Sequence, residues 1–328
     1  MKKIFLLFTF ILAVSKLSAI DLFTNKTFPM FNTYLENITD NLEEILPENT
    51  TMLSIQPDAF IGRFFPSIPP RFAAGLNFAG TLIDTKDFSD NLESISKDIV
   101  DALPEDFKTA IEFSIPQKIF LPTAAATFRI GGILFPFDAG IFAISTTDKL
   151  INDISFDDYS LNANYTCIGG DIRYALLEGG NILPKISIGA GYIWSKFYVG
   201  FEMNKTLFNS EYGAGLLNSD LNINLTGHTV YAQAQISKKF LLFTPYAGLK
   251  AFATVFNSDV DWKISTTGLY YNLNESANFS TSNDFDKIYC QFYTGCGIQL
   301  AFIQLSLNGA YNFSNKKLSA SLGLNFKI

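Results

Sequence analysis

Charged and aromatic side chains recur at alternate positions of several apolar segments in this 328-residue chain. Arg129, for example, lies between Phe128 and Ile130. The residues predicted to share one enclosed polar side are Arg71, Arg129, Asp171, Arg173, Lys185, Lys250, Lys287, Tyr289, Gln291 and Tyr293. A ring of cations around such a space would favour anionic solutes, and the aromatic rings would make it amphipathic.

A second interpretation gives the same basic residues a structural role. Two segments that read as helices carry acids that could neutralise them, namely Glu43, Glu44, Asp98 and Asp101. Buried charges in proteins are generally paired, because an isolated ion loses its hydration. We favour this pairing, and both interpretations place the helical segments inside or over the polar space.

Catalytic chemistry is poorly supported by the sequence. His228 is the only histidine, and no Gly-x-Ser-x-Gly motif accompanies it. An outer-membrane hydrolase would have to use His228 as its base, whereas a histidine at the rim or in the lumen is the simpler interpretation. We therefore predict no catalytic residue and no enzyme.

Metal binding is also weakly indicated. Cys167, Cys290 and Cys296 do not have the spacing of zinc ligands. Oxygen-bearing side chains gather in and beside one long loop, at Asp259, Asp261, Asn283, Asp284 and Asp286. They could hold Ca²⁺, but a solvated acidic loop is the favoured interpretation. We predict no metal site and no cofactor.

The elements that must position the polar residues are long segments of strict alternation. Side chains of a strand point to opposite faces in turn, so each segment has one apolar and one polar face. Such segments are 71–82, 123–132, 185–194, 241–255, 286–300, 302–313 and 318–328. A charge on a lipid face costs roughly 2–4 kcal/mol near the bilayer centre, and the apolar faces here carry no charge through their middle. Strands of a soluble sandwich are usually about five or six residues long, so these longer strands favour a membrane barrel.

Strand number and connections follow from the same pattern. Pairing from Arg71 onward gives ten strands, and counting 51–61 and part of 258–276 would give twelve. Short and long connections alternate, as in outer-membrane barrels. The alternation changes phase at Gly169 and Gly170, and again near Gly227 and His228. These positions predict either β-bulges or strands that leave the bilayer and need no apolar outer face.

The N-terminal region predicts export. Lys2 and Lys3 precede an apolar run over 4–14, which indicates a signal peptide, 1–19, cleaved near Ala19. Residues 20–50 are predicted to form a helical plug or cap, with Ile38, Leu42 and Ile45 on one stripe. The remainder, 51–328, is predicted to be the barrel, with a helical excursion at 85–122. A periplasmic cap and an external loop helix remain alternatives for the two helical segments.

The final strand carries the resemblance to a known class. Leu322, Leu324, Phe326 and Ile328 alternate on one face at the end of the chain, as in the signal read by barrel-insertion machinery. The chain resembles Gram-negative-type outer-membrane β-barrel proteins. More weakly, its N-terminal segment and abundant Phe are similar to hydrophobic-solute channels of the long-chain fatty-acid transporter type. The resemblance implies outer-membrane lipid and the insertion machinery as partners.

Together these features predict an all-β protein, an antiparallel transmembrane β-barrel of 10–12 strands with small helical plug or lid segments. We expect it in the outer membrane, where it would serve the passive passage or uptake of small solutes, hydrophobic ones among them. The alternative is a closed structural or surface-display barrel whose loops bind external partners. A net charge of −7 argues against nucleic acid as a partner, and the solute is not identified.

Overall fold

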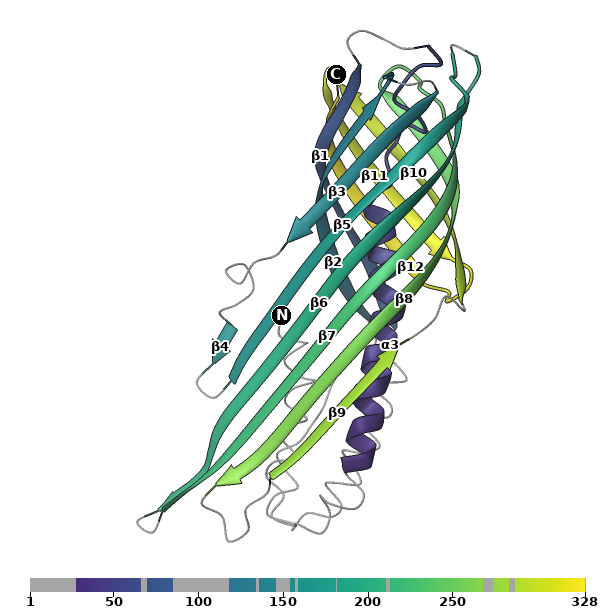
Figure 1. Ribbon diagram of the computed structural model, residues 1–328. Coiled ribbons are helices and arrows are strands. Elements are labelled where there is room, and N and C mark those ends of the chain that lie inside the picture. Colours follow the sequence, from purple (N-terminus) through teal and green to yellow (C-terminus); the bar gives the residue numbers. More distant parts are fainter. Residues whose placement is uncertain are drawn as a thin grey trace.

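A closed antiparallel barrel dominates the computed structural model (Figure 1). The structure describes residues 28–65, 70–84, 118–133, 136–145, 154–156, 159–180, 182–210, 213–267, 274–282 and 287–327. In order around the ring, the barrel strands are β1 (Arg71–Asp84), β2 (Lys118–Gly131), β3 (Phe137–Ser145), β5 (Tyr159–Leu177), β6 (Lys185–Ser210), β7 (Gly213–Ser237), β8 (Phe243–Thr267), β10 (Ile288–Leu300), β11 (Ile303–Asn312) and β12 (Leu318–Lys327).

Two contacts close the ring into ten strands. β12 pairs with β1, with Leu324 opposite Leu76, and β8 pairs with β10. Two further strands lie outside the ring: β4 (Ile154–Phe156) pairs with β5, and β9 (Asn274–Ser282) pairs with β8. The prediction of ten strands is confirmed. The twelve-strand alternative is wrong, because residues 51–61 form no strand and β9 takes no place in the ring.

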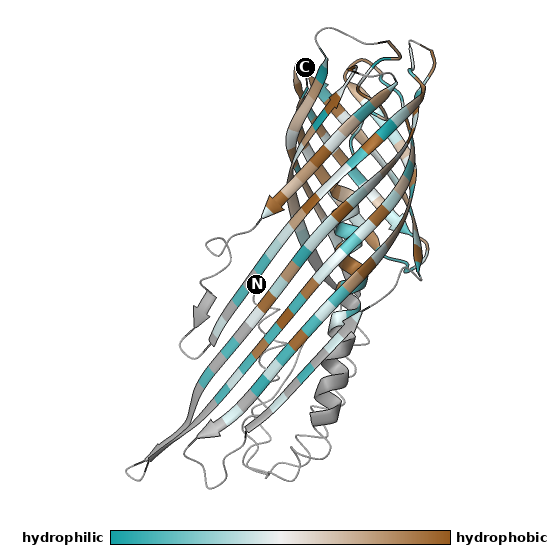
Figure 2. Ribbon diagram, in the orientation of Figure 1, coloured by the Kyte–Doolittle hydropathy of each residue, from teal (hydrophilic) through white to brown (hydrophobic). Residues whose placement is uncertain are grey.

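The predicted alternation of faces is confirmed along the described barrel strands. In β1, Leu76 and Phe78 are 48% and 47% exposed, whereas Asn77 between them is 2% exposed. The outward residues of β11 and β12 are all uncharged. Figure 2 shows the resulting apolar colouring of the barrel strands, which alternates with polar positions. Apolar side chains on the outside and polar ones inside are the reverse of a soluble sandwich.

Three strands continue far beyond the length that a bilayer requires. β6, β7 and β8 contain 26, 25 and 25 residues, whereas a tilted transmembrane strand needs about 9–11. The extra length lies at the rim where β1 ends and the long connection to β2 begins. We call this rim the long-loop rim. The opposite rim, where β1 begins and β12 ends, has the turns 238–242 and 301–302 and is called the short-turn rim.

The two predicted bulges are absent from these strands. Gly227 pairs with Ser195 and Gly169 with Ile193 in unbroken register. Inward residues of β7 simply change from polar near the short-turn rim to apolar at Leu225 and beyond. The alternative interpretation, strands that leave the bilayer, accounts for the phase change. Register shifts occur instead between Ala175 and Leu177 and between Thr206 and Phe208.

One helix lies among the residues that the structure describes. α3 (Phe28–Leu53) contains the predicted apolar stripe and continues past Pro47. The domain boundary drawn at residue 50 therefore divides one helix, and the barrel begins at Arg71 rather than at residue 51. No helix in the described residues is long and apolar enough to cross a membrane.

The predicted excursion at 85–122 needs one correction. Residues 118–122 belong to β2 and pair with β1 from Asp84 back to Gly80. The predicted strand began at residue 123, whereas sheet pairing extends it back through Pro122, whose side chain is exposed. The helix predicted for 89–103, the signal peptide and Ile328 lie outside the described residues.

Candidate functional site

The lumen of the barrel is occupied by the chain's own N-terminal segment, residues 44–62, which we call the plug. Glu44 forms an ion pair of 2.8 Å with Lys317, at the β11–β12 turn on the long-loop rim. Asp58 contacts Lys327, near the end of β12 on the short-turn rim. The plug therefore runs through the barrel from one rim to the other, and Figure 1 shows α3 entering the ring of strands.

Burial of the plug is continuous. Every residue from 45 to 62 is buried, and Ile45, Leu53 and Phe60 are 0% exposed. Below the helix, residues 54–62 make no regular secondary structure, so their backbone groups depend on the barrel wall for partners. The plug closes the lumen in this structure.

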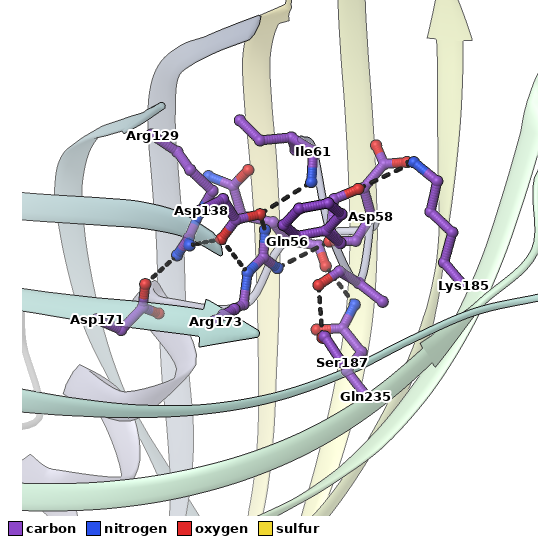
Figure 3. A network of polar contacts seen from close by, with 12 residues as sticks. Gln56, Asp58, Ile61, Arg129, Asp138, Asp171, Arg173, Lys185, Ser187 and Gln235 are labelled. Carbon is purple, nitrogen blue, oxygen red and sulfur yellow. Dashed lines mark hydrogen bonds and ion pairs between the residues drawn. The ribbon is translucent and has the colours of Figure 1, made fainter. Parts of the chain in front are cut away.

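A charged cluster on the wall stabilises the plug near the short-turn rim (Figure 3). Asp138 of β3 accepts hydrogen bonds from Arg129 (2.7 Å) and from two nitrogens of Arg173 (2.8 and 2.7 Å). Arg129 also contacts Asp171. The Ile61 amide of the plug donates to Asp138 Oδ2 at 2.8 Å, the oxygen that also accepts from Arg173. All four charged side chains are at most 4% exposed. Bidentate arginine–carboxylate pairs of this kind fix geometry as well as charge.

A second ionic contact joins plug and wall directly. Asp58 lies within 3.6 Å of the Lys185 Nζ atom, contacts Lys327, and accepts a hydrogen bond of 3.0 Å from Gln304. Lys185 also donates to the carbonyl of Phe60 at 2.9 Å. Asp58 is thus the acid that neutralises two lumenal lysines.

The C-terminal end of α3 is capped by a wall lysine. Lys250 is 1% exposed and donates to the Thr51 carbonyl (2.6 Å) and to Ser54 Oγ (2.8 Å). Its ammonium lies 4.7 Å from the ring centroid of Tyr231 and 5.8 Å from that of Tyr293. A cation at a helix C-terminus is favoured by the helix dipole, and the ring faces add cation–π attraction.

Near the long-loop rim, amide side chains hold a buried acid of the plug. Glu48 is 0% exposed and accepts hydrogen bonds from Gln291 (2.8 Å), Asn312 and Asn315 (3.1 Å). Uncharged donors of the wall therefore satisfy both of its oxygens. The plug is held by polar contacts along its whole length.

The predicted lumenal residues fall into three groups. Arg129, Asp171, Arg173, Lys250, Gln291 and Tyr293 are buried and point into the lumen, and Lys185 is partly buried there. Arg71 and Tyr289 are half-buried, and Tyr289 stacks on Phe252 with ring centroids 5.3 Å apart. Lys287 is exposed, just before β10.

The predicted pairing with plug acids is seen in part. Of the predicted cations, Lys185 does meet a plug acid, but that acid is Asp58, which was not predicted. Glu44 pairs with Lys317, which was not among the predicted cations, and the arginines pair with wall acids. Asp98 and Asp101 lie outside the described residues. Sequence reasoning missed Asp138, Asp58 and Glu48. Asp138 could have been found, because it alternates with apolar residues in 137–141, whereas the other two acids follow no strand pattern.

The remaining predicted residues lie on the outer face or rim. Leu322 and Phe326 point outward at 51% and 50% exposure, and Leu324 is half-buried. His228 lies on the outer face of β7, where its Nδ1 is 2.6 Å from the Tyr192 hydroxyl. Among the described residues, no three His, Cys, Asp or Glu side chains are grouped as metal ligands.

Comparison with known proteins gives fold likeness only. No family model and no curated protein matches the chain. Among solved structures it is similar to the outer membrane protease OmpT from Escherichia coli, at 11% identity over 79% of this chain and 97% of that one, with a TM-score of 0.37. The translocator domain of autotransporter NalP from Neisseria meningitidis gives 10% identity over 94% and 99%, with a TM-score of 0.34. The toluene transporter TbuX of Ralstonia pickettii gives 9% identity over 82% and 90%, with a TM-score of 0.24.

At TM-scores this low, none of these likenesses bears on what the chain binds or does. The geometry of the chain itself carries the assignment. A closed antiparallel barrel that turns its apolar side chains outward and encloses a polar lumen is the architecture of an outer-membrane β-barrel, the class that the alternating strands predicted.

Proposed function

We propose that this protein resides in the outer membrane and lets small solutes pass only when the plug leaves its place in the lumen. The observation that carries this proposal is the polar character of the wall behind the plug. Inward residues there include the buried amides Gln235, Gln291, Gln304, Asn77 and Asn312. If the plug filled the lumen permanently, apolar packing between plug and wall would stabilise it more. These amide side chains, in contrast, can be hydrated once the plug has left the lumen.

The mouth above the plug supports hydrophobic solutes among those admitted. Inward residues of the strand extensions are apolar and buried, as Leu221, Ile223, Leu225, Val260 and Trp262 show. These side chains are at most 5% exposed, so a solute entering from the long-loop rim would meet this apolar surface before the polar lumen only once the surface is uncovered. Burial of apolar surface there would favour its partition from water.

The second candidate function is a closed barrel that displays a surface element. Its specific support is the extension of β5 to β8, in which β9 adds a further strand outside the ring. In that case the plug never leaves and external partners bind the extension. Outer-membrane lipid around the apolar belt, and insertion machinery acting on β12, are proposed partners under both functions.

A reversible lock separates the two functions. Asn49 Oδ1 accepts a hydrogen bond from Thr81 Oγ1 at 2.5 Å, so a disulfide in the double variant N49C/T81C would tie plug to wall. The natural cysteines Cys167, Cys290 and Cys296 are first replaced by alanine, and N49C alone serves as the matched control.

Swelling of liposomes in small sugars, amino acids and short alcohols is the readout. Gated passage predicts permeation by the reduced double variant, none after oxidation, and no effect of oxidation on the single variant. Folded barrels that admit no solute in either state would contradict the proposal and favour display. Equal permeation in both states would contradict the requirement that the plug leaves.

A further inference from the structure

Wall side chains bind the main chain of the plug at six consecutive residues, 56–61. Gln235 donates to the carbonyls of Gln56 (2.7 Å) and Pro57 (3.4 Å), Arg173 to that of Asp58 (2.8 Å), Ser187 to that of Ala59 (2.6 Å) and Lys185 to that of Phe60 (2.9 Å). In the other direction, the Ala59 amide donates to Ser237 Oγ (2.9 Å) and the Ile61 amide to Asp138 Oδ2 (2.8 Å). Each residue of this stretch has at least one such contact.

The wall groups that make these contacts form one surface. They come from the neighbouring strands β3, β5, β6 and β7. Figure 3 shows Asp138, Arg173, Lys185, Ser187 and Gln235 around the plug. Their positions are fixed by other wall residues: Asp138 binds both nitrogens of Arg173 that face it, and Gln235 Oε1 accepts a hydrogen bond from Tyr293 (3.2 Å). A preorganised row of donors and acceptors recognises a peptide backbone with little loss of side-chain entropy.

We infer that this surface is a binding site for the backbone of an extended polypeptide, and that residues 56–61 are its resident occupant. The inference rests on the proposed function and names its solute class, short peptides. Main-chain recognition tolerates many sequences, as it does when a peptide adds to a sheet edge. Here side chains of the wall supply the partners that a sheet edge would supply.

One side-chain preference is built into the site. The carboxylate of Asp58 meets Lys185, Lys327 and Gln304, so an acidic residue is favoured at the third position of the bound peptide. The resident segment is covalently attached, so its high effective concentration keeps free peptides out. Binding in trans should therefore appear only after the segment is detached.

The test uses the full chain, folded before it is cut. A protease site placed in 66–69 allows the plug to be severed after folding in detergent and washed away, which mass spectrometry of the barrel confirms. A fluorescent peptide with the sequence of residues 54–63 is then titrated, and anisotropy reports its binding. Three further peptides are compared: one with the side chains shuffled around the fixed acid, one N-methylated at the Ala59 and Ile61 amides, and one with Asp58→Asn.

The inference predicts that the shuffled peptide binds within about threefold of the native one, that N-methylation weakens binding about tenfold or more, and that Asp58→Asn has an intermediate effect. In the wall, Q235L should weaken binding about tenfold. Q233L is its matched control, the same change two residues away on the same face of β7 at another buried glutamine, and should stay within about twofold.

Three results would overturn the inference: a severed plug that excess peptide cannot replace, no binding by the washed and folded barrel, or binding by the native peptide alone. Because anisotropy needs no flux, its outcome is separate from that of the liposome assay. Peptide binding without permeation would refute the proposed passage and leave the site in place.

Discussion

Replacing Asp138 by asparagine removes the one negative charge shared by two buried arginines. Arg129 keeps its contact with Asp171, but Arg173 loses both carboxylate contacts and retains only the Asp58 carbonyl. The asparagine amide also places donor hydrogens where guanidinium donors already point. Breaking a buried ion pair by removing one partner costs about 3–5 kcal/mol, because a charge is left buried and uncompensated.

That loss is large against the total stability of a folded domain, about 5–15 kcal/mol. Urea unfolding in detergent, followed by tryptophan fluorescence, should show a lower midpoint for D138N with an unchanged slope. The matched control is D259N, since Asp259 is an exposed aspartate of β8 that accepts a hydrogen bond of 2.8 Å from Ser280. We expect D259N to lie within about 0.5 kcal/mol of the unsubstituted protein.

A second variant distinguishes an ionic cause from a steric one. In D138L/R173L the carboxylate and the guanidinium that depend on each other are both replaced by apolar groups, which is often neutral for buried ion pairs. The double variant should therefore recover much of the stability lost in D138N. A D138N protein within about 1 kcal/mol of the unsubstituted one would refute the reasoning, because it would mean that the cluster is hydrated rather than buried.

Three further predictions address the belt, the cap and the direction of the plug. Ile172 is 57% exposed on the outer face of β5, so I172K should destabilise the barrel in liposomes by about 2–4 kcal/mol in urea unfolding, and a stability unchanged by it would contradict a lipid-facing belt. K250M removes the cation at the C-terminus of α3, so hydrogen exchange at residues 50–54 should accelerate by about tenfold, and unchanged exchange would show that Lys250 is no cap. In intact cells that make the protein without its natural cysteines, a membrane-impermeant maleimide should label D40C, which lies beyond the long-loop rim at an exposed position of α3, but not L241C, which is 93% exposed at the short-turn rim; the reverse pattern would invert the direction of the plug.

The barrel could be predicted from the sequence because lipid and lumen impose opposite demands on alternate residues. Arg129 and Lys250 are buried on the polar side of their strands, because a charge on the outer face would be costly at their depth. The pattern gave no information on which residues face each other across strands. Asp138 and Arg173 become partners through the register of β3 and β5, and register depends on turns and packing that alternation does not encode.

The path of the plug through the lumen could not be predicted from the sequence pattern. A helical stripe predicted that residues near Ile45 pack against something, without saying what. Residues 54–62 have no periodicity, because their backbone is satisfied by wall side chains rather than by a ladder of their own. The bulge predicted near Gly227 shows a related error. The apolar residues move to the other face of the strand where the strand leaves the bilayer, but the strand itself continues without a bulge.

Hydrogen exchange of the plug amides in the folded, detergent-solubilised protein tests most directly whether the chain closes its own barrel. The amides of Ala59 and Ile61 donate to buried wall acceptors, so their exchange should be slowed by orders of magnitude relative to an unstructured peptide and should proceed only through the minor state in which the plug has left the lumen. Exchange at these two positions within seconds, with the barrel strands still protected, would show that the lumen is open and would contradict the account.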